Sequence, residues 1–360
     1  MKFLIITNHS YMLWQFRREL IEELLQKGEV VISMPFVGHE EDFATKGCRC
    51  IETKLDRRGM NPWQEWQLFT DYWSLLKEER PDLVITYSIK PNLYAGLLCQ
   101  RMGIPYAANV QGLGTAFQSK KIAVPVSILY RAALRKARTV FFENKGNAKV
   151  FVSKRILPAK KITLLTGAGV NLDQYSYHPY PSVEGGVRFL YLGRIMREKG
   201  MDELFPAMRR LKAEYGEGVQ FDFVGFFEDD YKQTIENMNR QGILHFYGFQ
   251  ENPRPYYEAA HCVVLPSWHE GMSNVLLEGA AVGRALICSD IPGCREAVRD
   301  GKTGFLVVVK DGESLYRAMK AFLDLSVEER AVMGQCGRRW MEKKFDRKRV
   351  VDTTLQALEI

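Results

Sequence analysis

Two pairs of charged side chains in the second half of the chain have the types and spacing needed to bind phosphate and sugar groups. Arg194 and Lys199 lie in one short segment, residues 193–200, where a planar guanidinium and a compact ammonium group can hold a diphosphate. Glu270 and Glu278 are separated by seven residues, and both carboxylates can accept hydrogen bonds from hydroxyl groups. Each pair alone is also typical of solvated surface charges. Together they indicate a site for a nucleoside-diphosphate sugar.

The segment between the two glutamates is predicted to turn from a strand into a helix. An apolar run at residues 262–265 forms the strand, and Gly271 allows a tight turn after it. Ser273 or Asn274 can then cap a helix. The free N–H groups and the positive end of a helix dipole suit a phosphate. The simpler alternative is a capping loop beside a solvated glutamate.

Short apolar runs alternate with amphipathic stretches along the whole chain, which is typical of parallel strands joined by helices. In the first half, strands are predicted at residues 2–7, 30–34, 83–87, 106–110, 139–143 and 162–165, and helices at 14–26, 62–77 and 92–102. In the second half, strands are predicted at residues 187–192, 220–224, 244–247, 262–265, 285–288 and 305–308, and helices at 201–215, 229–240 and 274–282.

This pattern predicts two doubly wound α/β domains, 1–174 and 187–344. The segment 175–186 is rich in Pro, Tyr, Ser and Gly and has no strand or helix periodicity, which favours an interdomain linker. Residues 345–360 form a predicted helix with no strand after it. In doubly wound domains, ligands bind beyond the carboxyl ends of the strands, where the four charged residues are expected.

Several other classes of protein are disfavoured. The glycine-rich segments 112–117 and 167–172 lack the third glycine of a dinucleotide site. The seven cysteines are scattered and odd in number, and Cys48 and Cys50 have no second pair or nearby histidine, so reduced thiols are expected rather than disulfides or a metal site. No apolar run is long enough to span a membrane or to form a secretory signal, which favours a cytoplasmic protein.

Basic residues are concentrated in the first half of the chain. The formal net charge is +7, but residues 1–170 carry 25 basic and 15 acidic side chains, while residues 171–360 carry 25 and 28. The segment 119–138 has six basic and no acidic side chains among aliphatic ones, and such a segment can bind an anionic membrane surface. The alternative is an ordinary helix that buries its apolar stripe. Nucleic acid is disfavoured because no known nucleic-acid motif accompanies the charge. The basic residues are Lys120, Lys121, Arg131, Arg135, Lys136 and Arg138.

The second half resembles glycosyltransferase family 4, whose members are retaining enzymes with the GT-B fold. The resemblance rests on G-R-x-x-x-E-K-G at residues 193–200, H-E-G-x-S-N-x-x-x-E at 269–278, and the segments 290–296 and 301–305. More weakly, the first half resembles the subset that builds bacterial capsule, exopolysaccharide and lipid-linked oligosaccharides, through 90–96 and 111–114. The resemblance implies two Rossmann-like domains that face each other across a cleft, with residues 345–360 crossing back to the N-terminal domain.

The resemblance also implies a role for each matching residue. Arg194 and Lys199 would hold the donor diphosphate and stabilise its charge as the glycosidic bond breaks. Glu270 would orient the transferred sugar without forming a covalent intermediate, and Glu278 would bind the ribose hydroxyls. The implied catalytic residues are thus Glu270, Arg194 and Lys199, and the donor-binding residues are Gly193, Gly225, Gly248, Gly271, Met272, Ser273, Asn274 and Glu278.

The chain departs from the family at two places that bear on the acceptor. Residues 7–11 stand where many members have a Gly-Gly loop, and residues 109–111 stand where many have a histidine. The candidates for acceptor contact are His9, Lys90 and Gln111. For each of them, the alternative is a loop residue with a structural partner.

The sequence therefore predicts a cytoplasmic retaining glycosyltransferase, peripheral on the inner face of the cell membrane. It would transfer a hexose or N-acetylhexosamine from a nucleotide sugar, with UDP favoured, to a polyprenyl-diphosphate-linked glycan in bacterial surface polysaccharide synthesis. No cofactor and no catalytic metal are expected. Two alternatives are a nucleotide-sugar 2-epimerase on the same fold and a non-catalytic, nucleotide-sugar-binding scaffold protein. The spacing of the two glutamates and the segment 193–200 resemble the transferases more closely.

Overall fold

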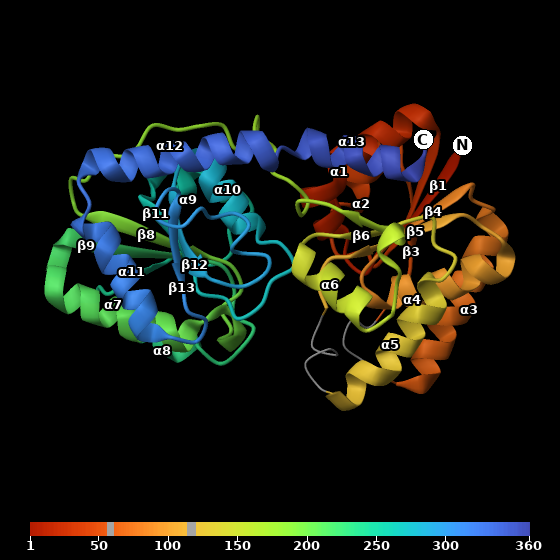
Figure 1. The fold of residues 1–360 in the computed structure, drawn as a ribbon, viewed down its shortest axis with the longest axis horizontal. Helices are drawn as coiled ribbons and strands as arrows, with labels where there is room; N and C mark the ends of the chain where they lie inside the picture. The colour runs from red at the N-terminus through yellow and green to blue at the C-terminus, as the bar shows by residue number, and fades with distance from the viewer. Residues whose placement is uncertain (56–60, 114–119) are drawn as a thin grey trace. The chain divides into compact units, whose positions relative to one another are not determined.

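The chain folds into two α/β units (Figure 1). Unit 1 contains Met1–Ala168 together with Lys348–Ile360, and unit 2 contains Gly169–Arg347. The computed structural model describes residues 1–55, 61–113 and 120–360.

The segment 175–186, predicted to be an interdomain linker, lies within unit 2. Tyr175 is buried in the core of that unit. The fully buried guanidinium of Arg284 donates a hydrogen bond to the Pro179 carbonyl at 3.1 Å. The lack of periodicity in this segment therefore reflects an irregular stretch that packs on unit 2, and the unit boundary falls earlier, between Ala168 and Gly169.

Unit 1 is built on a parallel sheet whose described strands follow the order β3-β2-β1-β4-β5-β6-β7. Consecutive residues of a strand point to opposite faces, so Leu4 contributes to one core and Phe3 to the other. The strands are β1 (Lys2–Ile6), β2 (Glu29–Met34), β3 (Arg49–Glu52), β4 (Leu83–Tyr87), β5 (Tyr106–Val110), β6 (Val140–Phe142) and β7 (Ile162–Leu164).

Helices cover both faces of this sheet. Side chains of α3, α4 and α5 share the core that contains Leu4, whereas side chains of α1, α2 and α13 share the core that contains Phe3. In α13, Val350, Val351 and Leu358 are buried in this second core. The described α-helices of the unit are α1 (Ser10–Lys27), α2 (Glu40–Thr45), α3 (Pro62–Glu79), α4 (Ile89–Met102), α5 (Lys120–Leu134), α6 (Lys145–Ser153) and α13 (Arg347–Leu358).

Unit 2, all of whose residues are described, has a parallel sheet in the order β10-β9-β8-β11-β12-β13. Helices α7 and α11 pack together, as do α10 and α12 (Figure 1). Its strands are β8 (Val187–Leu192), β9 (Val219–Val224), β10 (His245–Phe246), β11 (Cys262–Leu265), β12 (Ala285–Ser289) and β13 (Gly304–Val307). Its α-helices are α7 (Met201–Tyr215), α8 (Lys232–Arg240), α9 (Arg254–Ala259), α10 (Asn274–Val282), α11 (Gly312–Asp324) and α12 (Val327–Lys344).

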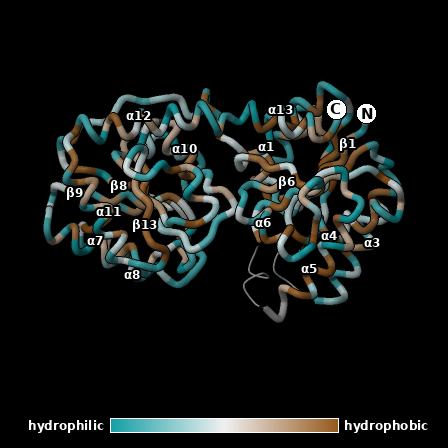
Figure 2. The backbone as a smooth tube through the Cα atoms, in the orientation of Figure 1, coloured by the Kyte–Doolittle hydropathy of each residue, from teal (hydrophilic) through white to brown (hydrophobic). Residues whose placement is uncertain are grey.

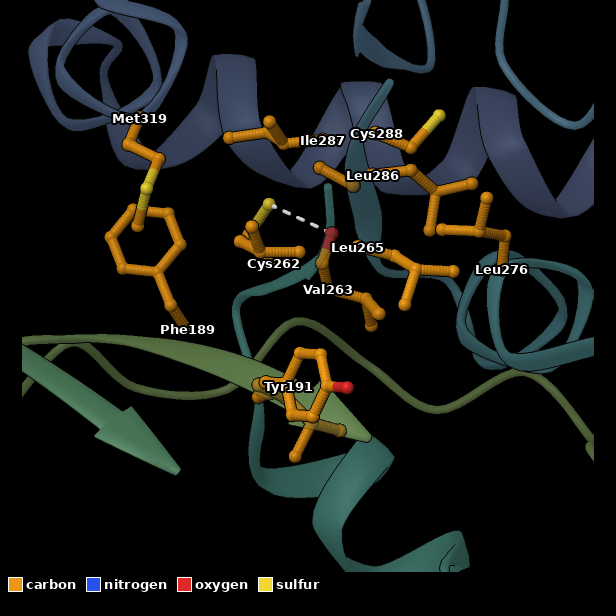
Figure 3. Close-up of a cluster of buried hydrophobic side chains, with 14 of the residues drawn as sticks. Phe189, Tyr191, Cys262, Val263, Leu265, Leu276, Leu286, Ile287, Cys288 and Met319 are labelled. Carbon is orange, nitrogen blue, oxygen red and sulfur yellow. Dashed lines mark hydrogen bonds between the residues drawn. The ribbon is translucent and has the colours of Figure 1, made fainter. Parts of the chain in front are cut away.

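The core of unit 2 includes the strand residues that precede the segments carrying the charged residues, such as Tyr191 and Leu265. Hydrophobic residues make up much of strands β8 and β13, as Figure 2 shows in brown. In Figure 3, Tyr191 of β8 lies beside Val263 and Leu265 of β11, with Leu276 of α10 in the same cluster. This packing holds fixed the strand ends and the helix start from which the candidate site is built.

The predicted α/β fold with two parallel sheets is confirmed. Every predicted strand is present, because apolar runs bounded by turns are a strong signal for buried parallel strands. The predicted elements do not include α2, β3, α6 and α9, which are short and rich in polar residues, nor the longer helices α11 and α12. Among the described residues, none of the helices combines the length and the apolar character that crossing a membrane requires.

Candidate functional site

The loops that follow β8, β9 and β10 meet at one edge of the unit 2 sheet, because parallel strands end on the same side. The Gly193 N–H donates to the Val224 carbonyl at 2.9 Å, and the Gly225 N–H donates to the Gly248 carbonyl at 2.8 Å. A Cβ atom at Gly225 would lie 1.8 Å from the Gly193 oxygen. Gly225 therefore has a structural role at this edge, since only glycine lets the two loops touch.

Arg194 projects from the loop after β8. Its carbonyl accepts a hydrogen bond from the Tyr191 hydroxyl at 2.6 Å, which fixes the backbone of the loop. Its guanidinium pairs with the carboxylate of Glu228, which follows β9, at 2.5 Å. The Arg194 side chain is nevertheless 44% exposed. The guanidinium is therefore held in place by one carboxylate and still open to solvent at the sheet edge.

Lys199 and Glu270 form an ion pair that joins the loops after β8 and β11. Both side chains are nearly buried, with exposed fractions of 15% and 14%. The same two loops are linked by a backbone hydrogen bond, in which the main-chain N–H of Trp268 donates to the Glu198 carbonyl at 2.9 Å. The structure thus brings together the two segments that the sequence places some seventy residues apart. A low-dielectric setting strengthens the attraction between such charges.

The first turn of α10 begins at the same edge. The Ser273 hydroxyl caps the helix by accepting from the Leu276 N–H at 3.4 Å, and Met272 beside it is buried. The Oδ1 atom of Asn274 is buried and has no hydrogen-bond partner among the described residues. Within the turn, the Ser273 N–H donates to the Gly293 carbonyl at 2.9 Å, so the N–H groups of Asn274 and Val275 are the ones that this helix start can direct at an anionic or hydroxyl-bearing group.

Glu278 lies one turn further along α10 and is only 7% exposed. The Tyr257 hydroxyl donates a hydrogen bond to its Oε2 atom at 2.9 Å. Burial raises the pKa of the Glu278 carboxyl to about 7, although the Tyr257 hydrogen bond and the positive charge of Arg347 both act to lower it. Near neutral pH this carboxyl therefore titrates, and its ionised form can accept hydrogen bonds from two neighbouring hydroxyl groups.

Replacing Glu278 with glutamine is expected to stabilise the protein at pH 8 by on the order of 2 to 3 kcal/mol, and much less at pH 5. In the unfolded chain the carboxyl loses its proton near its usual pKa of 4.5, but in the folded chain it keeps the proton up to about pH 7. The wild-type protein therefore loses stability as the pH rises from 4.5 to 7, and the variant does not.

Thermal and urea unfolding at the two pH values measures this difference. Glu236→Gln, at a half-exposed position on α8, is a control expected to change little at either pH. An equal stability change for Glu278→Gln at pH 5 and pH 8 would contradict the assignment of a raised pKa.

The three acceptor candidates lie after strand ends of the unit 1 sheet. His9 precedes α1, and its backbone N–H donates to the Thr7 hydroxyl at 3.3 Å. Lys90 is the second residue of α4 and pairs with Glu65 of α3 at 2.5 Å. Gln111 follows β5, and its side-chain amide lies 3.4 Å from the sulfur of Met12. Each of the three residues has a partner within unit 1, which agrees with the alternative of a loop residue with a structural partner. These contacts therefore do not identify one of the three as the acceptor-binding residue.

Lys90 lines a pocket of about 750 Å³. The pocket lies between the end of β3 and one side of α3, and its other charged residues are Glu52, Lys54, Glu65, Asp71 and Glu78. Lysine and carboxylate groups among the lining residues give this pocket the hydrogen-bonding capacity that a polyhydroxylated ligand requires.

Sequence reasoning missed a buried ion pair in unit 1. Arg17 of α1 pairs with Glu143, directly after β6, at 2.8 Å, and both side chains are at most one-tenth exposed. The Arg17 guanidinium also lies over the ring of Tyr87, at the end of β4. Burial raises the pKa of the Glu143 carboxyl, and Arg17 and Gln111 act to lower it. In the sequence, Arg17 looks like a surface residue of an amphipathic helix, so no local signal reveals this contact.

The predicted basic segment forms α5 and the turn after it. Arg131, Arg135 and Lys136 are exposed, whereas the Arg138 guanidinium bonds to the Leu358 carbonyl of α13. The side chains of Lys120 and Lys121 lie outside the described part of the structure. Of the glycine-rich segment 112–117, only the first two residues are described.

No cluster of three or more His, Cys, Asp or Glu side chains among the described residues is arranged to hold a metal ion.

Comparison with known proteins finds matches over most of the chain. Residues 2–144 match a family model described as glycosyl transferase 4-like, and residues 186–324 match one described as glycosyl transferases group 1. An N,N'-diacetylbacillosaminyl-diphospho-undecaprenol alpha-1,3-N-acetylgalactosaminyltransferase from Campylobacter jejuni is 24% identical over 331 residues, which is 87% of this chain and 86% of the relative. The capsular polysaccharide biosynthesis glycosyltransferase CapM from Staphylococcus aureus is 24% identical over 77% of this chain and 78% of its own length.

Solved structures show the same fold over the full chain. Anabaena HepE in complex with UDP and glucose superimposes with a TM-score of 0.82 at 14% identity, covering 100% of this chain and 99% of HepE. Sucrose-phosphate synthase from Thermosynechococcus elongatus gives a TM-score of 0.79 at 19% identity, with 100% and 98% coverage.

Proposed function

Because the chain belongs to glycosyltransferase family 4, with its two-domain GT-B fold, we propose that it is a retaining enzyme that uses a nucleotide sugar as donor. UDP is the favoured nucleotide, and the transferred sugar is a hexose or an N-acetylhexosamine. Its acceptor is a polyprenyl-diphosphate-linked glycan, and it acts in bacterial surface polysaccharide synthesis. The single observation that carries the proposal is the Lys199–Glu270 ion pair beside the first turn of α10.

Each side chain at this edge has a distinct proposed task. Arg194 and Lys199 bind the diphosphate and stabilise the negative charge that grows on it as the glycosidic bond breaks. Glu270 accepts hydrogen bonds from hydroxyls of the sugar, and Glu278 binds the ribose. Backbone N–H groups of the turn 271–274, other than that of Ser273, which bonds to the Gly293 carbonyl, contact the sugar and the distal phosphate. The loop at Gly248 faces the nucleobase.

The proposed reaction forms and breaks bonds on one face of the sugar. The acceptor oxygen bonds to the anomeric carbon from the side that the phosphate leaves, and the departing phosphate oxygen takes the acceptor's proton. No side chain becomes covalently attached, and no metal or cofactor supplies charge in this scheme, because Arg194 and Lys199 supply it.

The proposed acceptor and cellular location follow from two kinds of support. The name of the Campylobacter jejuni relative specifies a diphospho-undecaprenol-linked acceptor, and the exposed basic residues of unit 1 suit an anionic membrane surface. We place the enzyme on the inner face of the cell membrane. The pocket beside Lys90 is the proposed contact region for the acceptor glycan.

The decisive test is nucleotide release from a panel of UDP- and GDP-sugars, with and without a polyprenyl-diphosphate-linked acceptor. The proposal predicts release of UDP that rises strongly with acceptor, and a product in which nuclear magnetic resonance shows the donor's anomeric configuration. Interconversion of the donor sugar without acceptor would instead identify an epimerase. Donor binding without any turnover would identify a binding scaffold.

A further inference from the structure

Helix α5 is apolar on two faces. One face is buried in unit 1 through Ala123, Tyr130 and Leu134. On the other, Val124 is 62% exposed and Ile128 59% exposed, and Leu129 beside them is exposed as well. An amphipathic helix needs only one apolar face to pack on its own domain, so the second face requires a different explanation.

Helix α3 carries a second exposed apolar surface. Trp63 is 75% exposed and Trp66 62% exposed, and Trp73 is also on the surface. Residues 63, 66 and 73 fall on one side of a helix with 3.6 residues per turn. The opposite side of α3 is already used, because Leu68, Tyr72 and Leu75 are buried in the core. Large exposed tryptophans in a row are uncommon on the surface of a soluble domain.

These two surfaces belong to one layer of helices. Helix α4 packs against both α3 and α5, and the three helices cover the same face of the unit 1 sheet (Figure 1). The Trp66 ring stacks on Phe69, which in turn meets Tyr94 of α4 with ring centroids 6.2 Å apart. The guanidinium of Arg101 in α4 lies over the Trp73 ring at 5.7 Å. Trp66 and Trp73 are therefore linked to α4, Trp66 through Phe69 and Trp73 through Arg101.

The charges around this layer are unevenly distributed. Arg131, Arg135 and Lys136 are exposed at the end of α5, and residues 120–138 contain no acidic side chain. The acidic residues of α3 are otherwise engaged: Glu65, Asp71 and Glu78 line the pocket, and Glu79 pairs with Lys2 and Arg49. A cationic rim beside tryptophans and aliphatic side chains matches the composition of a surface that binds anionic lipid headgroups.

We propose that the outer face of α3, α4 and α5 docks on an anionic lipid bilayer. Its apolar members, Trp63, Trp66, Trp73, Val124, Ile128 and Leu129, enter the headgroup region. Arg131, Arg135 and Lys136 contact the lipid phosphates. This inference rests on the proposed function, because a polyprenyl-diphosphate acceptor is held in a membrane, and it adds the tryptophans of α3 as anchors.

Binding to vesicles of phosphatidylglycerol and phosphatidylcholine, measured by flotation, tests this surface. The wild-type protein is expected to float with these vesicles, with a blue shift of tryptophan fluorescence. Trp63→Gln combined with Trp66→Gln is expected to weaken binding about tenfold or more at both low and high salt, since it removes apolar area. Arg131→Gln with Arg135→Gln and Lys136→Gln is expected to weaken binding at low salt and to remove the dependence on phosphatidylglycerol.

Matched controls lie on α12 of unit 2. Val332→Gln removes an exposed apolar side chain there, and Arg339→Gln with Lys343→Gln and Lys344→Gln removes three exposed charges. Both should float like the wild type. Unchanged flotation of the tryptophan variant would overturn the proposal. So would a dimer, seen by light scattering, that the tryptophan variant converts to monomer, because the face would then bind a second copy of the chain.

A water-soluble, short-chain acceptor separates this inference from the proposed function. The tryptophan variant is expected to keep wild-type transfer to that acceptor and to lose transfer to a vesicle-embedded one. If the wild-type protein floats but transfers sugar to neither acceptor, the proposed function fails while the docking surface stands.

Discussion

Replacing Arg194 with alanine is expected to lower the rate of glycosyl transfer by about 100- to 1,000-fold while the protein stays folded. The guanidinium lies at the end of β8, is 44% exposed and is positioned by Glu228. It is therefore available to a diphosphate, and its contribution grows as negative charge develops on the leaving group. Because the side chain is not part of the unit 2 core, its loss should shift the thermal unfolding midpoint little.

A second arginine in the same segment provides the control. Arg197 is more exposed than Arg194, pairs with Asp202 at 3.0 Å and lies over the Trp268 ring. Arg197→Ala removes the same charge three residues away and should leave turnover within about threefold of the wild type. Steady-state kinetics with the best donor of the panel measures both variants. Near-native turnover by Arg194→Ala would refute its proposed role.

Replacing Glu270 with alanine is expected to abolish detectable transfer, or to reduce it by at least about 100-fold, without loss of UDP binding. This carboxylate is assigned to the sugar alone, and UDP has no transferred sugar. In the absence of ligand Glu270 is paired with Lys199, so its removal also releases an ammonium group toward the phosphates. UDP affinity should therefore stay equal or increase, as titration calorimetry can measure.

Two further variants serve as controls for this result. Glu270→Gln keeps the shape of the side chain, which separates the lost charge from any local collapse around Lys199. Glu198→Gln removes a neighbouring carboxylate that contacts His269 at 3.1 Å, and it should leave turnover nearly unchanged. A Glu270→Ala protein that loses UDP affinity and turnover in parallel would show that the carboxylate supports the diphosphate site rather than the sugar.

Much of the fold was predictable because its determinants are local. The strands at 83–87, 106–110 and 187–192 have the bounds that their apolar runs predict. Parallel strands must end at one edge, so the meeting of residues 193–200 with residues 266–274 also follows from sequence. By contrast, β3 has the sequence Arg-Cys-Ile-Glu, and its identity as a strand depends on pairing with β2 rather than on its own composition.

The partners of the site residues were not predictable, because they come from distant segments with no pattern of their own. Tyr257 reaches Glu278 from α9, and Arg17 reaches Glu143 across 126 residues. The proposed membrane surface was likewise only partly predictable from the sequence. Charge alone pointed to residues 119–138, but the exposure of Trp63 and Trp66 depends on which side of α3 the core occupies, and only the packed structure decides that.

The Lys199–Glu270 and Arg194–Glu228 pairs have a consequence for which molecules the site accepts. In the resting enzyme each cation already has an internal counterion, so a simple anion must compete with a carboxylate and gains little by entering. In the proposed donor complex a nucleotide sugar offsets the loss of both pairs, because its phosphates bind the two cations while its hydroxyls donate to Glu270. After transfer the sugar has left, so we expect Glu270 to pair with Lys199 again and to favour release of the nucleotide. The proposed binding mode therefore predicts weak binding of simple anions and release of the nucleotide after each transfer.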